Sequence, residues 1–348
     1  MTRVAPFVLV ALLGASPAPA AENPDAALLS EAQKLFKPLP RDLATAGFPI
    51  TTERIALGRV LFFEPRASLD GTVSCARCHL PALYGTDGLA RSIGVKDRPN
   101  PRNAPTVLNA ALQPFAHWRG DRTSVEDQAR KALVGPPSFG QPDVESAMKQ
   151  LDAIPGYRAL FQKAFPRDPQ PVNADNWASA IGAFERTLVT PSPFDAYLKG
   201  KVSALSPSAR AGLRSFIQQG CVSCHNGVGI GGASFQKFGL TSDYWKETGS
   251  KTADKGRFDV TGNEADAYVF KVASLRNVAM TPPYFHDGSV ASLPEAVRVM
   301  AKVQLGKDLS PEELTPLVAF LESLTGGVPE SFSASPVLPA AGFTAQVR

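Results

Sequence analysis

Apolar residues recur every three or four positions along most of this chain, and that spacing predicts helices rather than strands. The pattern predicts helices over Asp25 to Phe36 and over Thr52 to Phe63. A third helix is expected to start at Asn173, a residue type that caps helices, and to run through Leu188. Few segments show the alternation of a half-buried strand. We therefore expect a mainly α fold.

Two more helices are expected at serine–proline pairs, because serine caps a helix and proline suits its first position. One begins at Ser206-Pro207 and runs into Cys221. The other opens with the capping box Ser310-Pro311-Glu312-Glu313 and ends near Leu324. The 31 prolines and 28 glycines indicate long loops between the helices. The tail over residues 327–348 is expected to be extended.

Composition narrows the class of protein. The chain has 348 residues, of which 44% are hydrophobic and 20% charged, values typical of a globular protein that is large enough for two domains. A net charge of +4, with the basic residues dispersed, is too small to suggest binding to nucleic acid. The expected partners are therefore small molecules and soluble proteins.

The N-terminus predicts export. Arg3 precedes an apolar stretch from Ala5 to Ala15, and the small residues Ala18-Pro19-Ala20 follow. This is the pattern of a secretory signal peptide over residues 1–20, too short for a membrane span. We expect cleavage after Ala20 and a mature protein in the periplasm, without a membrane span.

All four cysteines lie in two Cys-x-x-Cys-His motifs. These are Cys75, Cys78 and His79 in "SCARCH", and Cys221, Cys224 and His225 in "GCVSCHNG". The motif is the attachment signature of a c-type haem, whose iron the histidine binds. A zinc site is the alternative, but 142 residues separate the two pairs and a histidine follows each directly. The sequence therefore predicts two covalently bound haem c groups.

Each motif leads one half of a faint internal repeat. The first is followed by "RNAPTVLN" and "HWRGDRTSVEDQARKAL", the second by "RNVAMTPP" and "YFHDGSVASLPEAVRVM". Each half thus contains Arg-Asn, an aromatic turn and a helix capped by Ser124 or Ser292. We expect two related cytochrome c-like haem domains, residues 21–190 and 191–326, divided near Thr190 to Pro193.

The repeat also suggests how the two irons are completed. Met300 lies eight residues after Ser292, just over two helical turns, so it can project from a helix across the second haem. A methionine opposite His225 would suit electron transfer. The equivalent position in the first half is Ala132, which cannot bind iron, so the first haem is expected to be open. Core filling by Met300, with Met280 as the ligand instead, is the alternative.

The chain contains, in order between about Ala32 and Gly326, "SCARCH", "RNAPTVLNAA", "FDAYLKG", "GCVSCHNG", "DKGRFDVT", "LRNVAMTPPYFHDG" and "MAKVQLGKDLSPEEL". Together these segments resemble the bacterial dihaem cytochrome c peroxidases and their MauG-type relatives. The resemblance implies a C-terminal haem that receives electrons, an N-terminal haem that meets peroxide, and a calcium ion between the two domains. It is also compatible with a homodimer.

Carried over by position, the resemblance implies roles for single residues. It supports Met300 as the second haem's ligand and makes Trp118 an electron relay between the haems, with a packing aromatic as the alternative. The side chain of Asn103 and the backbone carbonyls of Thr281 and Pro283 match the calcium ligands, and oxygen donors are what calcium prefers.

Two more matches concern polar side chains. Gln128 matches a glutamine on the distal side of the first haem. His286, in "YFHDG", matches a histidine that the family carries, and a hydrogen-bonded structural role is expected for it rather than iron binding.

The chain departs from the family at two positions. Many of these peroxidases carry a histidine sixteen residues after the first haem-binding histidine, where it closes the resting haem; this chain has Val95 there. They also carry a glutamate in the loop after the Gln128 helix, as acid–base partner for peroxide. The loop Leu133 to Pro142 has no acidic residue, and Ser138 falls nearest.

The second departure leaves the proton-transfer group open. Gln128 can hydrogen-bond a peroxide but cannot carry its proton. His117 is a possible substitute, with a surface or propionate-contacting histidine as the alternative. Asp121, Glu126 and an ordered water chain are further candidates.

Three functions fit these features. The preferred one is an exported dihaem peroxidase that reduces hydrogen peroxide to water at the open first haem, with electrons from a small c-type cytochrome or a copper protein (cupredoxin). The second is a MauG-type oxidase that modifies side chains of a partner protein; Met300 counts against it, because the MauG enzyme has a tyrosine on that haem. The third is a non-enzymatic electron carrier, which needs a hidden sixth ligand on the first haem, such as His117.

Overall fold

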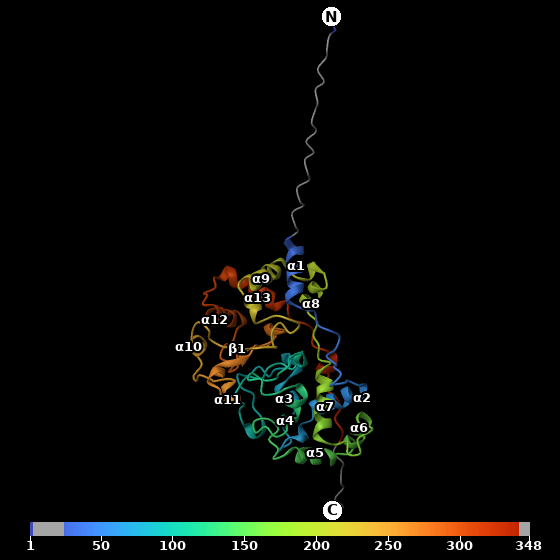
Figure 1. The fold of residues 1–348 in the computed structure, drawn as a ribbon. Helices are drawn as coiled ribbons and strands as arrows, with labels where there is room; N and C mark the ends of the chain where they lie inside the picture. The colour runs from blue at the N-terminus through green and yellow to red at the C-terminus, as the bar shows by residue number, and fades with distance from the viewer. Residues whose placement is uncertain (3–23, 341–348) are drawn as a thin grey trace, which may run out of the picture.

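The computed structural model describes residues 1–2 and 24–340, and helices joined by long loops dominate it (Figure 1). The mainly α fold is confirmed. Residues 3–20 of the expected signal peptide, with its cleavage site, lie outside the described residues. No helix in the described part of the chain is long and apolar enough to cross a membrane.

The elements of the first half are helical. They are α1 (Pro24–Leu35), α2 (Thr52–Phe62), α3 (Cys75–Cys78), η3 (Val95–Asp97), η4 (Ala110–Leu112), α4 (Val125–Ala132), α5 (Val144–Asp152), α6 (Tyr157–Ala164) and α7 (Ala174–Glu185), where η denotes a short 3-10 helix.

The second half adds one small hairpin to its helices. Its elements are α8 (Pro193–Leu198), α9 (Pro207–Gln218), η6 (Cys221–Ser223), β1 (Phe235–Lys237), α10 (Tyr244–Thr248), α11 (Phe258–Thr261), β2 (Val269–Lys271), η8 (Val278–Met280), α12 (Leu293–Leu305), α13 (Pro311–Glu322) and α14 (Glu330–Ser333). The two strands are antiparallel, with Phe235 opposite Lys271.

The five helices predicted from the sequence are present, and their predicted caps form. Asn173 accepts a hydrogen bond from the backbone of Asn176 at the start of α7, and Ser310 and Glu313 form the capping box of α13. The α7 helix ends at Glu185, three residues before the expected end. The α9 helix ends before Cys221, because Gly220 adopts a left-handed conformation with φ +91°.

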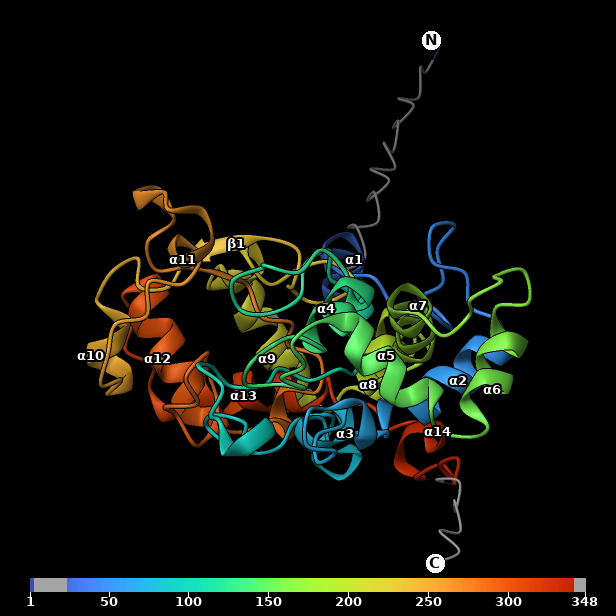
Figure 2. The ribbon, with the colours of Figure 1, turned by 90° about the horizontal axis from the view of Figure 1, so that it is seen from below.

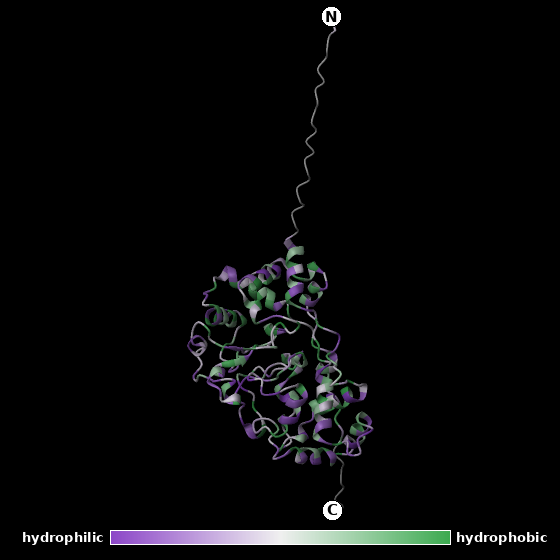
Figure 3. Ribbon diagram, in the orientation of Figure 1, coloured by the Kyte–Doolittle hydropathy of each residue, from purple (hydrophilic) through white to green (hydrophobic). Residues whose placement is uncertain are grey.

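Two large buried clusters form most of the core, and a small third one contains Leu39, Leu43 and Val189. The first is built mainly on α2 and α4–α7, and the second on α1, α8, α9, α12 and α13. Each contains a pair of helices that touch through a glycine. A Cβ on Gly58 of α2 would lie 1.8 Å from the carbonyl oxygen of Ala180, and one on Gly212 of α9 would lie 1.8 Å from that of Pro316. These close crossings hold each half together, and Figure 3 shows apolar residues gathered in both helix groups.

Each end of the chain packs in the core of the opposite half. Leu28 and Ala32 of α1 pack in the second cluster, whereas Phe332 of α14 packs in the first, with its ring centroid 5.7 Å from that of Phe62. Figure 1 shows α1 beside α8, and Figure 2 shows α14 near α2. The tail is therefore not extended throughout: burial of Phe332 fixes a short helix over Glu330–Ser333. The boundary between two domains near Thr190 to Pro193 stays a prediction. If it is right, α1 and α14 each pack against the domain to which they do not belong in the sequence.

The internal repeat is present in the structure, with a register different from the predicted one. Asn109 and Asn277, 168 positions apart, are left-handed (φ 59° and 60°) and precede η4 and η8. The same offset relates the helix caps Ser124 and Ser292. Pairing Arg102-Asn103 with Arg276-Asn277 is therefore wrong by six residues, because identical letters do not mark the same backbone conformation.

Thr190 lies between the two repeats. Its Oγ1 accepts hydrogen bonds from Nδ2 of Asn109 at 2.7 Å and from Nδ2 of Asn277 at 2.9 Å. The equivalent asparagines of both halves thus meet at one buried hydroxyl group, which fixes the halves relative to each other.

Candidate functional site

The first cysteine motif forms a single helical turn. Cys75 and Cys78 begin and end α3, and His79 follows. Nδ1 of His79 lies 2.9 Å from the carbonyl oxygen of Gly85, which can only accept, so Nδ1 carries the hydrogen. Nε2 is therefore the unprotonated nitrogen, the one that can bind a metal.

The second motif repeats the spacing of the first but not its hydrogen bond, since Nδ1 of His225 is buried without a hydrogen-bond partner in the described part of the chain. Gly231 follows His225 by six residues, as Gly85 follows His79, and both glycines have positive φ (103° and 72°). A Cβ on Gly231 would lie 2.6 Å from the carbonyl oxygen of Ala273 and 2.9 Å from Nδ1 of His225. Only glycine fits between the backbone and that ring.

The chemistry of both motifs fits covalent haem. Burial lowers the pKa of His79, and lowers that of His225 to about 4, so both rings are neutral, the form that binds iron. Burial also raises the pKa of Cys75 and raises that of Cys221 to about 11. The described part of the chain contains no group of three or more His, Cys, Asp or Glu side chains placed to hold a metal ion.

Val95 is a core residue. It is completely buried, and its N–H donates to the carbonyl oxygen of Ser138 at 3.2 Å. A Cβ on Gly140 would lie 2.4 Å from Cγ1 of Val95. Asn100 donates from Nδ2 to the carbonyl oxygen of Pro137 at 2.8 Å. The Val95 loop is thus packed against the loop that lacks the family's glutamate.

Two of the candidate acids are held in ion pairs. Glu126 binds Arg186, with Nε–Oε1 2.7 Å and Nη2–Oε2 3.1 Å, and this pair joins α4 to α7. Asp121 contacts Arg122, Arg119 and His117. Burial acts to raise the pKa of Asp121, but these three neighbours hold it well below its ordinary value. Asp121 is therefore ionised and poorly suited to donate a proton.

The other two polar candidates are more accessible. His117 has a left-handed backbone and a side chain that is 36% exposed, with Nδ1 3.3 Å from Oδ1 of Asp121. Gln128 lies on α4 and is half-buried. The contacts of both side chains are compatible with a role in proton transfer.

Glu185 is a buried carboxyl that the sequence reasoning missed. It ends α7 and is 5% exposed. Burial raises its pKa to about 8, and the charge of Glu126 adds to this while Arg186 opposes it. Burial raises the pKa of Cys75, and Glu185 lies near enough to raise it further where both groups ionise. A protonated acid therefore lies near the first motif at pH 7; the available signal was an acidic residue inside the apolar run "AIGAFERTL".

Met300 and Met280 differ in their surroundings. Met300 lies on α12, partly buried between Val299 and Val303, which pack in the second cluster. Met280 ends η8 and is 43% exposed. A ligand that must reach an enclosed iron is better supplied from the packed helix.

Trp118 joins the two halves. Its Nε1 donates to the carbonyl oxygen of Asn103 at 3.0 Å, and its own carbonyl oxygen accepts from the N–H of Lys271 at 2.8 Å. Asn103 in turn donates from its N–H to the carbonyl oxygen of His286 at 2.7 Å. The indole therefore lies where backbone segments of the two halves meet.

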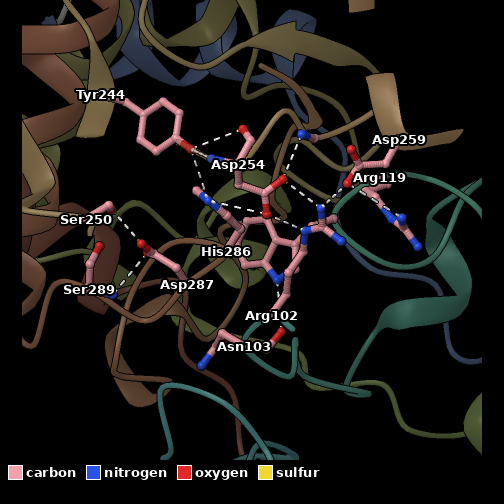
Figure 4. Close-up of polar contacts among 12 residues, drawn as sticks. Arg102, Asn103, Arg119, Tyr244, Ser250, Asp254, Asp259, His286, Asp287 and Ser289 are labelled. Atoms are coloured by element: carbon pink, nitrogen blue, oxygen red, sulfur yellow. Dashed lines mark hydrogen bonds and ion pairs between the residues drawn. The ribbon is translucent and has the colours of Figure 1, made fainter. Parts of the chain in front are cut away.

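A cluster of charges closes this junction (Figure 4). Arg102 binds Asp254 through two hydrogen bonds, of 2.7 and 2.6 Å, and Asp259 at 3.0 Å. Nε2 of His286 lies 3.8 Å from Asp254 and 3.4 Å from Oη of Tyr244. Burial lowers the pKa of His286, so the ring is neutral, and its contacts favour the structural role expected for it.

Asn103 has the orientation that a cation ligand needs. Its side chain is nearly buried, and Nδ2 donates to the carbonyl oxygen of Leu89 at 2.9 Å. This leaves Oδ1 as the free donor to a cation. The bond from Asn103 to His286 brings it to the segment that contains Thr281 and Pro283. The contacts of Asn103 are thus compatible with the expected calcium ligands.

Comparisons with known proteins agree with these motifs. A sequence profile described as "Di-haem cytochrome c peroxidase" matches residues 52–203. The cytochrome c551 peroxidase of Pseudomonas aeruginosa is 43% identical over 319 residues, which covers 90% of each chain. That of Nitrosomonas europaea is 42% identical over 292 residues, which covers 84% of this chain and 85% of the relative.

A solved structure resembles the whole fold. The crystal structure of "a MauG-like protein associated with microbial copper homeostasis" has a TM-score of 0.74 and 30% sequence identity, covering 86% of this chain and 96% of that one.

Proposed function

The chain belongs to the dihaem cytochrome c peroxidase/MauG family, and from this premise we propose how its two halves divide the reaction. It is an oxidoreductase of the cytochrome c peroxidase class, and its family implies two haem c groups. Cys75 and Cys78 would hold the haem at which hydrogen peroxide reacts, and Cys221 and Cys224 would hold the haem that accepts electrons from the donor.

Haem iron, when bound, supplies the redox chemistry that splits the O–O bond, and the chain determines its ligands and access. His79 and His225 hold the two irons through Nε2. The hydrogen bond from His79 to Gly85 fixes the ring that faces the first iron. Met300, on α12, would supply the other protein ligand of the second iron.

The observation that carries this division is the packing of Val95. Where many relatives place a closing histidine, this chain has a completely buried aliphatic side chain against Gly140 and Ser138. Val95 would therefore leave the first iron without that closing ligand in the resting enzyme. Gln128 is the residue proposed to hydrogen-bond the peroxide, and Trp118 the one to pass electrons between the halves.

Several finer features belong to the same proposal. Asn103, Thr281 and Pro283 bind a calcium ion at the junction of the halves. The signal peptide directs the protein to the periplasm, where a c551-type cytochrome is the donor that the relatives' names suggest, with a cupredoxin as the alternative. A homodimer remains compatible with the resemblance.

The test is to purify the oxidised holoenzyme, record the spin state of both haems, and add peroxide with and without reduced cytochrome c. One high-spin and one low-spin haem, with rapid oxidation of the cytochrome, is the expected result. A long-lived oxidised species that ignores the cytochrome would favour the MauG-type oxidase. Two low-spin haems inert to peroxide would indicate the non-enzymatic carrier and contradict the proposal.

A further inference from the structure

Lys271, in β2, is a cation buried between the two halves. Its side chain is almost inaccessible to solvent, and its Nζ donates a hydrogen bond to Oε1 of Gln113, in the segment that leads to Trp118. The pKa of Lys271 falls to about 8 through burial alone, without the opposing effect of a nearby carboxylate. Burying an uncompensated charge costs free energy, so this lysine needs an explanation.

The repeat gives Lys271 a structural counterpart. The offset of 168 positions that relates Asn109 to Asn277 also relates Asn103 to Lys271. Asn103 donates its N–H to the carbonyl oxygen of His286, and Lys271 donates its N–H to that of Trp118, the residue equivalent to His286. The two backbone contacts are therefore reciprocal, as in a two-fold arrangement of the halves.

The same offset relates the proposed calcium ligands to the surroundings of the lysine. The equivalent pairs are Asn103 and Lys271, Thr281 and Gln113, and Pro283 and Phe115. The contact between Lys271 and Gln113 thus stands where the repeat would place a second cation site. At the proposed calcium site the chain supplies oxygen ligands. At the equivalent position it supplies both the cation, Lys271, and the oxygen that accepts its hydrogen bond, Oε1 of Gln113.

We propose that the ammonium group of Lys271 is a tethered cation, equivalent in the repeat to the calcium ion, and that it positions Trp118 between the halves. This rests on the proposed calcium site and on the proposed relay. Lys271 holds the relay segment twice, at Gln113 through Nζ and at Trp118 through its backbone N–H. One half of the junction then depends on a metal, and the other does not.

Gln113, the partner of Lys271, also contacts the loop that follows the second cysteine motif. A Cβ on Gly232 would lie 2.8 Å from Cγ of Gln113, and the preceding Gly231 lies against the ring of His225. Displacing Gln113 would therefore disturb both the relay segment and the loop that supports the second iron's histidine. Lys271 acts through these groups, as a positioning residue.

The test compares Lys271→Ala with Lys237→Ala in the holoenzyme. Lys237 lies in the partner strand β1 and is exposed, so it is a matched control. We expect Lys271→Ala to slow electron exchange between the two haems several-fold, because the relay segment loses the hydrogen bond from Nζ to Gln113. Added propylammonium, which replaces the lost charge and volume, should restore most of the rate. The control Lys237→Ala should have the wild-type rate with and without propylammonium.

The outcomes distinguish whether Lys271 acts through its positive charge or only fills space between the halves. Equal rates in Lys271→Ala and the wild type, or a slow variant that does not respond to propylammonium, would overturn the inference. Lys271→Gln, which keeps a polar side chain, serves if the alanine variant does not fold; it should also be slow, and wild-type rates in it would overturn the inference too. A wild-type enzyme without peroxide turnover would instead refute the proposed function.

Discussion

The rings of Trp118 and His286 meet edge to face, with centroids 6.3 Å apart, and the two residues occupy equivalent positions of the internal repeat. The junction between the halves is thus built from one turn used twice. One copy presents an indole that donates to the carbonyl oxygen of Asn103. The other presents a neutral imidazole.

Trp118→Phe should slow peroxide turnover. Phenylalanine keeps an aromatic ring in the contact with His286 but loses the hydrogen bond to Asn103, and it is harder to oxidise than tryptophan. We expect turnover with reduced cytochrome c to fall by at least about tenfold, the cost of about 1.4 kcal/mol in the barrier, with both haems still attached. Trp245→Phe, on α10 in the second cluster, is the matched control and should turn over normally. Normal turnover in Trp118→Phe would reject the relay role.

Met300→Ala should convert the second haem from low-spin to high-spin, because no thioether remains to complete the iron. The visible and electron paramagnetic resonance spectra of the oxidised protein report this directly. Met280→Ala removes an exposed methionine from η8 and should leave the spectra unchanged. The reverse pattern would assign the ligand to Met280.

The sequence was sufficient for features with local causes. Caps such as Asn173 and Ser310 predict helix starts because their hydrogen bonds reach only three residues ahead. The Cys-x-x-Cys-His motifs and the segments that carry the family resemblance are short runs of neighbouring residues, so they can be read without knowing the fold. The comparisons confirm the resemblance.

Features that depend on packing could not be predicted from the sequence. Glu185 and Lys271 are charged residues in apolar runs, but their burial follows from how distant segments meet. The repeat register was misplaced because the Arg-Asn pair at Arg102 looks like the one at Arg276, whereas the backbone of Asn109 marks the true equivalent of Asn277.

Gly231→Ala should destabilise the second half. The residue has φ +103°, and a Cβ would approach the carbonyl oxygen of Ala273 and the ring of His225 within 3 Å. Backbone strain of this kind costs about 1–3 kcal/mol, and the clash adds to it. Gly227→Ala is a matched control, since Gly227 also has positive φ but nothing within 4 Å of a Cβ. Thermal unfolding should show a larger loss in Gly231→Ala, together with a changed spectrum of the second haem; equal losses would deny the close contact.

Removal of calcium should weaken the junction of the halves. Asn103 is tied to Leu89 and His286, and its Oδ1 is the side-chain donor proposed for the ion. Chelation of the wild-type enzyme should reduce turnover, and added Ca²⁺ should restore it. Asn103→Ala should have low turnover whether or not Ca²⁺ is added. An enzyme that is indifferent to chelation and has no bound calcium by elemental analysis would disprove the site.

Glu185 should make folding stability depend on pH in one direction. Its pKa is raised from the ordinary 4.5 to about 8 by burial, so the folded protein keeps a proton that the unfolded chain releases above about pH 4.5. Its contribution to stability is therefore fully present below pH 4.5 and is lost as the pH rises to about 8, by up to about 1.4 kcal/mol per pH unit. Glu185→Gln cannot titrate, so its free energy of unfolding should exceed that of the wild type by a margin that grows across this window. Glu31→Gln, an exposed control on α1, should follow the wild type at every pH. Parallel denaturation curves for Glu185→Gln and the wild type between pH 5 and 8 would show that Glu185 is ionised in the fold, with its charge balanced by Arg186.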